Sequence, residues 1–410
     1  MACLGSSRLC ARAEKLCQFG NLSQIRKKLS TTFIKSQTEI EHILSPKVQQ
    51  CQNRTTTSGG LCRIGIARSM SSMQTIQPGS LPDYQIDPYR LVEDDIKLVY
   101  HQIRSILDRY SMQDELKKIA KYYFCGKGKA IRPTCIILMS RALNYHKDET
   151  TTLTNLQQSL AMYVEMIHNA SLLHDDMIDL ADVRRGAPSA NVLWNQQQVA
   201  FAGNYILVVA TMLLARHQHN EITITLADII SDLVQGEMMQ LGSKETENER
   251  FAHYLNKTFR KTASLIANSL KATAIATEMN EEIVELAYQY GRNIGIAFQL
   301  VDDFLDFVAS SAMMGKKTAV DLKLGLATAP VLFACEKYPE LNAMIMRRFQ
   351  EPNDVEKAYE LVHKSHGLEQ TKFLARKHCA EAVRLIQSLA ESPYQKALIV
   401  LSDLVINRIK

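Results

Sequence analysis

Two copies of one acidic pattern constrain this chain more than any other feature of its sequence. Each copy reads Asp-Asp-x-x-Asp and lies among apolar residues; the aspartates are Asp175, Asp176 and Asp179, then Asp302, Asp303 and Asp306. On an α-helix, positions i and i+4 share a face, and position i+1 lies about 100° round from i. Each copy therefore directs two carboxylates the same way, with a third alongside.

Carboxylates crowded between apolar segments repel one another strongly unless cations lie between them. Oxygen ligands select Mg²⁺ or a similar hard cation, which usually binds substrate phosphates as well. A single copy would more often be a solvated helix face, and paired carboxylates could also store calcium. Two copies in apolar helices, neither of them like an EF-hand loop, favour a metal-diphosphate site.

The amino-terminal part of the chain differs in composition from the rest. Residues 1–75 carry eleven lysines and arginines against three glutamates, and serine and threonine are frequent there. This basic, acid-poor composition is typical of a mitochondrial presequence; a disordered basic tail that binds acidic surfaces is the alternative. We expect a largely disordered presequence over residues 1–80 and a folded domain over residues 81–410.

The remaining composition narrows the class of protein. The net charge of +5 is mild, and a hydrophobic content of 46% is ample for a sizeable core. The nine cysteines include no C-x-x-C pair, which favours reduced thiols used as small hydrophobic residues. No run approaches 18 uninterrupted apolar residues, so no transmembrane helix is expected. No nucleic-acid partner is expected either.

Helical periodicity dominates the chain after residue 81. Apolar residues recur at three- and four-residue steps between Leu91 and Leu107, and residues 153–180 continue in the same style. No proline occurs between Pro188 and Pro330, and convincing alternating strands are absent. The pattern predicts a single all-α domain of a dozen or so helices.

Basic residues are placed where they could complement metal-bound phosphate. Lys129 and Arg132 follow a glycine-rich turn and open a helix, and a helix N-terminus with such neighbours is a good diphosphate cradle. The other basic groups are Arg184-Arg185, Lys261 beside Thr262, and Lys316-Lys317. Each alone is more often a solvated charge. Together with two acidic clusters they indicate one pocket for two anionic substrates.

The run from Leu172 to Asp179, followed by Arg184-Arg185-Gly186, resembles the first aspartate-rich motif of trans-polyprenyl diphosphate synthases. The run from Gln299 to Asp306 resembles their second motif, and the order along the chain is the same. The family's usual Gly-Gly-Lys reads Lys127-Gly128-Lys129 here. The resemblance implies the all-α isoprenoid synthase fold, an antiparallel helical bundle around a central cavity.

The resemblance also implies roles for individual residues. Asp175, Asp179 and Asp302 would coordinate Mg²⁺. The allylic diphosphate would bind to Arg184, Lys261, Thr262, Gln299 and Lys316, and isopentenyl diphosphate to Lys129, Arg132, His168 and Arg185. His168 could instead be an ordinary helix histidine. The implied catalytic set is all six aspartates with Arg184 and Lys261.

The family resemblance extends to product and partners. Ala170 and Ser171, just before the first cluster, are small where bulky residues would stop growth, so a long product of about decaprenyl length is implied. The allylic primer would be farnesyl or geranylgeranyl diphosphate. The resemblance implies an enzyme of the mitochondrial matrix that makes the ubiquinone side chain. It would work as a hetero-oligomer (a heterotetramer) with a second polyprenyl synthase subunit, in peripheral association with the inner membrane.

Two other readings remain open from the residues. A terpene cyclase or a squalene-synthase-like enzyme also ionises prenyl diphosphates with paired acidic motifs, but a cyclase needs no site for isopentenyl diphosphate. A non-catalytic partner subunit would be expected to lose aspartates or the arginine pair, and this chain keeps all of them.

Overall fold

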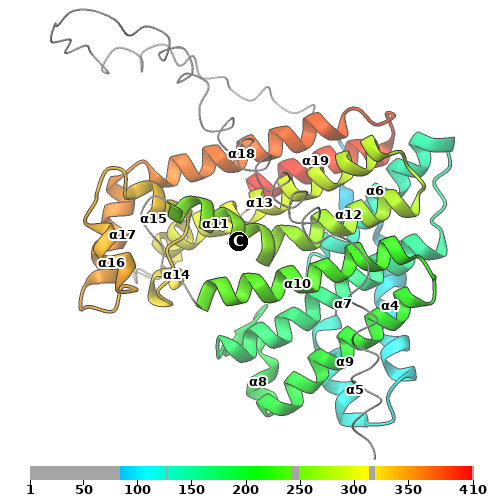
Figure 1. The fold of residues 1–410 in the computed structure, drawn as a ribbon, viewed down its shortest axis with the longest axis horizontal. Helices are drawn as coiled ribbons and strands as arrows, with labels where there is room; N and C mark the ends of the chain where they lie inside the picture. Colours follow the sequence, from blue (N-terminus) through cyan, green and yellow to red (C-terminus); the bar gives the residue numbers. More distant parts are fainter. Residues whose placement is uncertain (1–83, 126–127, 242–248, 314–318, 409–410) are drawn as a thin grey trace, which may run out of the picture. The chain divides into compact units, whose positions relative to one another are not determined.

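The computed structural model describes residues 84–125, 128–241, 249–313 and 319–408 (Figure 1). The predicted presequence, residues 1–80, lies outside the described residues. The prediction of an all-α fold is confirmed: in the described residues, helices are joined by turns and loops, and the strands are a single antiparallel pair of two residues each, β1 (Val183–Arg184) and β2 (Ala187–Pro188).

The helices follow one another with short connections. Those before β1 are α3 (Pro88–Leu91), α4 (Glu93–Arg109), α5 (Asp114–Lys121), the 3₁₀ turn η3 (Tyr122–Phe124), α6 (Ile131–Asp148) and α7 (Asn155–Ile178). Those from β2 to the end of the second acidic cluster are α8 (Ala190–Leu193), α9 (Gln196–Ala215), α10 (Asn220–Leu241), α11 (Arg250–Thr258), the π-helical segment η5 (Phe259–Ala263), α12 (Ser264–Ala276) and α13 (Glu281–Met313). The last are α14 (Val320–Lys323), α15 (Ala329–Ala334), α16 (Leu341–Met346), α17 (Asp354–Lys364), α18 (Gly367–Ile386) and α19 (Pro393–Asn407).

Capping residues and prolines determine where several helices begin. Thr154 and Gln157 form a reciprocal capping box at the start of α7, which satisfies backbone N–H groups that would otherwise lack partners. Ser392 caps α19, and Pro393 occupies its first turn, where the missing N–H costs nothing. The predicted helix after Lys129 begins at Ile131 and has Pro133 in its first turn.

The two helices that carry the acidic clusters lie in the interior of the bundle. Helix α7 packs against α9, α6 and α12, and every residue from Ser159 to Ala170 is buried. Helix α13 packs against α12 and α18 (Figure 1). A helix that is buried all round needs no polar face, and the middle of α7 is buried on every side. Both clusters therefore emerge from the core of the domain.

Helices α14, α16 and α17 form a smaller unit next to the second cluster, at the left of Figure 1. Its own hydrophobic cluster includes Phe307 of α13, Leu341, Met344 and Val362. Phe307 follows Asp306 directly, so this small core fixes the end of the second acidic motif.

Helix α9 is long and apolar enough to cross a membrane by length and composition alone. The sequence led us to expect no such helix, because its polar residues interrupt the apolar run. The helix packs against α7 and α5, and it exposes Phe201 and Val208 on its outer face.

Candidate active site

The middle aspartate of the first cluster is turned into the protein. Asp176 is fully buried and accepts hydrogen bonds from Tyr123 Oη at 2.5 Å and from Arg184 Nε at 2.8 Å. Arg184 also donates from Nη2 to the same carboxylate. The backbone N–H of Ala190 donates to Tyr123 Oη at 3.0 Å, so the tyrosine is itself held in place. Asp176 thereby fixes the position of Arg184 at the mouth of the site.

The middle aspartate of the second cluster has matching surroundings. Asp303 is 1% exposed and accepts from Tyr254 Oη at 2.5 Å and from Gln299 Nε2 at 2.9 Å. The backbone N–H of Ala329 donates to it at 3.4 Å. Burial raises the pKa of Asp303 to about 6, although these donors oppose the rise. In both clusters, the residue one position after the first aspartate points into the bundle and binds a buried tyrosine.

The outer carboxylates of the first cluster face cationic side chains. Asp175 Oδ1 lies 3.3 Å from Lys261 Nζ, and its Oδ2 lies 3.7 Å from Arg184 Nη2. Partial burial and the neighbouring Asp175 raise the pKa of Asp179, which ends helix α7. This region concentrates negative charge that an incoming cation would relieve.

The outer carboxylates of the second cluster have different partners. Asp302 accepts from Arg408 Nη2 at 3.1 Å, and the guanidinium of Arg408 stacks on Phe298 with its carbon 3.9 Å from the ring centroid. Asp306 accepts the backbone N–H groups of Val320 and Asp321, both at 3.2 Å, and so holds the start of α14. Arg408 lies two residues from the end of the chain. No sequence motif there indicated a role for it.

Within the part of the chain that the structure describes, Lys261, Arg184 and Arg408 contact the acidic clusters. These side chains relieve part of the repulsion between the carboxylates. Among the described residues, no three carboxylate, histidine or cysteine side chains lie close enough to form a ready-made metal site. The donor set is nevertheless all oxygen, and Asp175 and Asp302 remain partly exposed. These residues fit a hard divalent ion that completes its coordination with diphosphate oxygens.

Lys261 and Thr262 lie on the π-helical segment η5. Lys261 Nζ reaches Glu237 Oε1 at 2.9 Å and Gln240 Oε1 at 3.2 Å in addition to Asp175. Sequence reasoning missed Glu237 and Gln240; the signal that could have indicated them is their polarity in the otherwise apolar end of α10. Isolated π turns inside α-helices occur frequently at functional sites.

Thr262 connects this segment to the second cluster. Its Oγ1 donates to Gln299 Oε1 at 2.9 Å, and the amide of Gln299 donates in turn to Asp303. The structure thus brings Lys261, Thr262 and Gln299 together between the two acidic clusters.

A second basic group forms around Arg132 and His168. Arg132 Nη1 lies 3.0 Å from His168 Nε2, and burial followed by the charge of Arg132 lowers the pKa of His168 well below its usual value. The imidazole is therefore neutral, and its Nε2 accepts from the guanidinium. Lys129 and Arg104 line an adjoining cleft of about 440 Å³. Arg104 is a further cation that the sequence did not indicate.

The turn between β1 and β2 sends its two arginines to different places. Arg185 and Gly186 both have positive φ, of 53° and 73°, as tight hairpin turns require. Arg184 binds Asp176, whereas the Arg185 guanidinium lies against Gly128: a Cβ there would come within 2.8 Å of Arg185 Nη1. Arg184 therefore contacts the first acidic cluster, whereas Arg185 lies beside the loop that carries Lys129.

The remaining predicted residues are placed as follows. Ala170 is fully buried, and Ser171 is half-buried with its hydroxyl donating to the His168 carbonyl at 2.8 Å. Lys316 lies outside the described residues.

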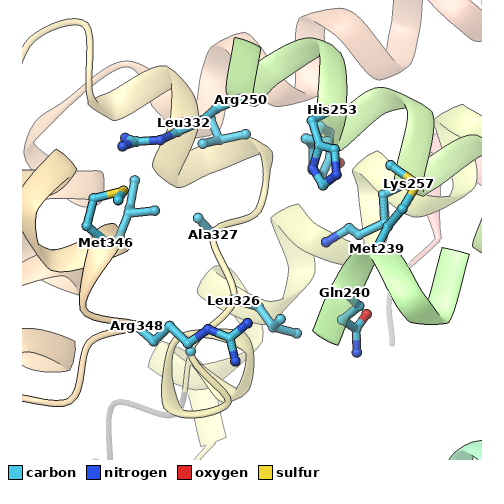
Figure 2. Close-up of a pocket in the computed structure, with 13 residues that line it drawn as sticks. Met239, Gln240, Arg250, His253, Lys257, Leu326, Ala327, Leu332, Met346 and Arg348 are labelled. Atoms are coloured by element: carbon cyan, nitrogen blue, oxygen red, sulfur yellow. The ribbon is translucent and has the colours of Figure 1, made fainter. Parts of the chain in front are cut away.

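A further cavity of about 70 Å³ has Tyr254, the hydrogen-bond donor to Asp303, in its lining (Figure 2). Arg250, His253 and Lys257 of α11 line one side of it and Arg348 the other (Figure 2). The charge of Lys257 opposes the burial-driven rise in the pKa of Asp303. One cation in the cavity lining, Lys257, therefore acts on the carboxylate of Asp303. No sequence motif indicated this cavity.

Comparison with known proteins agrees with this arrangement. Residues 113–362 match the family described as polyprenyl synthetase. The chain is 47% identical over 365 residues to human all trans-polyprenyl-diphosphate synthase, covering 89% of this chain and 87% of that protein. It is 41% identical over 345 residues to decaprenyl-diphosphate synthase subunit 1 of Schizosaccharomyces pombe, covering 78% of this chain and 91% of that protein.

Solved structures show the same fold. The decaprenyl diphosphate synthase of Rhodobacter capsulatus superposes with a TM-score of 0.70 at 27% identity, covering 79% of this chain and 98% of that chain. The polyprenyl synthase of Caulobacter crescentus, crystallised with calcium and isoprenyl diphosphate, gives a TM-score of 0.69 at 29% identity, covering 80% of this chain and 99% of that chain. The chain is a member of the polyprenyl synthetase family.

Proposed function

We propose that this chain is a Mg²⁺-dependent trans-prenyltransferase that condenses an allylic diphosphate with successive molecules of isopentenyl diphosphate. The observation that carries the proposal is the β1–β2 turn, which directs Arg184 to the acidic clusters and Arg185 to a separate basic group. Two anion sites are what a condensation of two diphosphates requires. A cyclase acts on one diphosphate and has no use for the second site.

The first substrate would bind where the acidic clusters meet Lys261. The C–O bond of the allylic diphosphate breaks to leave an allylic cation and pyrophosphate. Lys261 and Arg184, joined by Lys316, neutralise the negative charge that develops on the leaving group. Asp175, Asp179 and Asp302 would hold Mg²⁺, which supplies further positive charge there when bound.

The second substrate would bind at Lys129, Arg132, His168 and Arg185. Neutral His168 orients Arg132 by accepting its hydrogen bond, so the guanidinium keeps its remaining donors for the diphosphate of isopentenyl diphosphate. The alkene of that substrate attacks the allylic cation. Loss of a proton, with pyrophosphate as the base, restores an allylic product five carbons longer.

We further propose that the product is long, of about decaprenyl length, and supplies the ubiquinone side chain in the mitochondrial matrix. Ala170, just before the first cluster, is small and buried, which supports the proposal because no bulky side chain stands there to stop growth. The names of relatives support the compartment: a rice protein that is 39% identical over 349 residues is named solanesyl-diphosphate synthase 1, mitochondrial.

A second subunit is part of the proposal. The fission yeast relative is named subunit 1, and two consecutive helices of this chain expose large apolar side chains that a partner could cover. They are Phe201 and Val208 on α9, and Ile224, Val234 and Met238 on α10. We propose a polyprenyl-synthase-like subunit as the partner, with the assembly associated peripherally with the inner membrane.

The test is incorporation of labelled isopentenyl diphosphate by the protein, alone and with a candidate second subunit. Farnesyl and geranylgeranyl diphosphate serve as primers, with Mg²⁺ or with a chelator. We expect Mg²⁺-dependent incorporation and a product of about fifty carbons by mass spectrometry. Absence of incorporation under every pairing would favour a non-catalytic subunit, and a cyclic product from the primer alone would favour a cyclase.

A further inference from the structure

The π-helical segment η5 is held from outside by helix α10. A π turn is rare because its hydrogen-bond geometry is poor, so it persists where surrounding contacts impose it. Asp232 of α10 accepts from Arg260 Nη1 at 2.6 Å and from Ser264 Oγ at 2.6 Å. Arg260 lies within the segment and Ser264 directly follows it, so the two carboxylate oxygens bracket Lys261.

Two glycines bring the neighbouring helices close to the same backbone. A Cβ at Gly236, one turn after Asp232, would lie 3.0 Å from the Lys261 backbone nitrogen. On α13, a Cβ at Gly295 would lie 2.5 Å from the Ala263 Cα. The segment therefore lies between α10 and α13 at a separation that larger residues would prevent.

The next turn of α10 engages the side chain of Lys261 itself. Glu237 and Gln240 both lie within hydrogen-bond distance of its Nζ. Helix α10 thus holds the side chains of Arg260 and Ser264, before and after Lys261, through Asp232. It also contacts the ammonium group of Lys261, which lies 3.3 Å from Asp175 Oδ1.

We infer that Asp232, with Gly236 and Gly295, forms a clamp that positions Lys261 for the diphosphate of the allylic substrate. Asp232 is a positioning residue, since its contacts are with Arg260 and Ser264 and not with the acidic clusters. The inference rests on the proposed function, because it needs Lys261 to bind that diphosphate. The competing account is a half-buried ion pair that only stabilises the fold.

The first test compares Michaelis constants for the two substrates. Asp232→Asn removes the negative charge that Arg260 and Ser264 contact. This change should raise KM for the allylic diphosphate about tenfold. It should change KM for isopentenyl diphosphate less than about twofold. Ser264→Ala, a milder change, should raise the allylic KM about threefold. A variant that loses stability but leaves the allylic KM unchanged would overturn the clamp.

Gly295→Ala and Gly291→Ala form a matched pair on α13. A Cβ at Gly291 would lie 2.8 Å from the Ala267 Cα in α12, beyond the π segment. Both changes should lower the thermal midpoint, but only Gly295→Ala should raise the allylic KM. Equal effects of the two on that constant would contradict the clamp.

A double-mutant cycle with Lys261→Ala separates the clamp from the proposed function. Lys261→Ala alone should raise the allylic KM, and an unchanged value would overturn the assignment of Lys261. If Asp232 acts through Lys261, Asp232→Asn should cost less than about twofold in the Lys261→Ala background. If the double variant instead shows the product of the two single-variant increases in the allylic KM, the clamp is overturned and the assignment of Lys261 stays intact.

Discussion

At the scale of single residues, the outer and middle aspartates of each cluster have different surroundings. Asp176 and Asp303 are buried acceptors for tyrosine hydroxyls, whereas Asp175 and Asp302 are partly exposed and paired with basic side chains. A buried carboxylate that satisfies an arginine contributes to folding, because its loss leaves the arginine without its partner. The outer carboxylates can exchange their partners for a metal ion at little cost to the fold.

Asp176→Ala should therefore lower the free energy of unfolding by about 3 kcal/mol, because Arg184 and Tyr123 lose a buried acceptor. Asp175→Ala should change it by less than about 0.5 kcal/mol and lower kcat at least about a hundredfold. Urea unfolding and steady-state kinetics measure the two effects. Equal destabilisation by both changes would contradict the distinction between middle and outer aspartates.

A second prediction at this scale concerns how the free energy of unfolding depends on pH. It involves His378, which lies outside the candidate active site. Burial, then the charges of Arg292 and Lys377, lowers the pKa of His378 from 6.5 to about 4. The folded state therefore binds fewer protons than the unfolded state between these values. The stability from the neutral imidazole is present above pH 6.5 and is lost as the pH falls toward 4.

The His378 contribution can be isolated with His378→Gln, which cannot titrate. The difference in free energy of unfolding between the native protein and this variant should shrink by up to about 3 kcal/mol from pH 7 to pH 4. Urea unfolding at both pH values gives the difference, in which acid effects common to the two proteins cancel. A difference independent of pH would show that His378 is not held neutral.

At the scale of elements, the β1–β2 turn allows the two predicted anion sites to be separated. Arg184→Ala should raise KM for the allylic diphosphate, and Arg185→Ala should raise KM for isopentenyl diphosphate, each about tenfold or more. Each variant is the control for the other. A rise in the same constant for both would indicate that the two arginines serve a single site.

Helix α7 offers a test of product length. Ala170→Phe places a large ring in a buried position one turn before Asp175, and we expect a sharply shorter product on chromatography. Ala161→Phe is the control, because Ala161 is also fully buried on α7 but lies further from the acidic cluster. Overpacking alone would destabilise both variants alike. An unchanged product from Ala170→Phe would contradict the proposed role of Ala170.

At the scale of the whole molecule, the exposed apolar side chains of α9 and α10 predict assembly. Phe201 is 66% exposed and Val234 is 59% exposed, so charged residues there should leave the fold intact. Phe201→Glu with Val234→Lys should reduce the mass of the assembly in light scattering. A control, Val320→Glu, changes an apolar residue on α14 that is 51% exposed and should leave that mass unchanged.

The sequence by itself determined that the domain is helical, that two acidic clusters emerge from buried helices, and that basic residues accompany them. These features depend on local spacing, since periodicity and cap residues act within a few turns. The resemblance assigned Arg132 and His168 to one substrate, and the structure places these two residues side by side.

Only the tertiary structure decided which aspartate of each cluster faces the core. Tyr123 and Asp176 are far apart in the chain, as are Tyr254 and Asp303, and no local pattern connects them. The same holds for Arg408, which reaches Asp302 from the end of the chain. The π segment depends on contacts from α10 and α13 on either side, and such contacts exist only once the helices have packed.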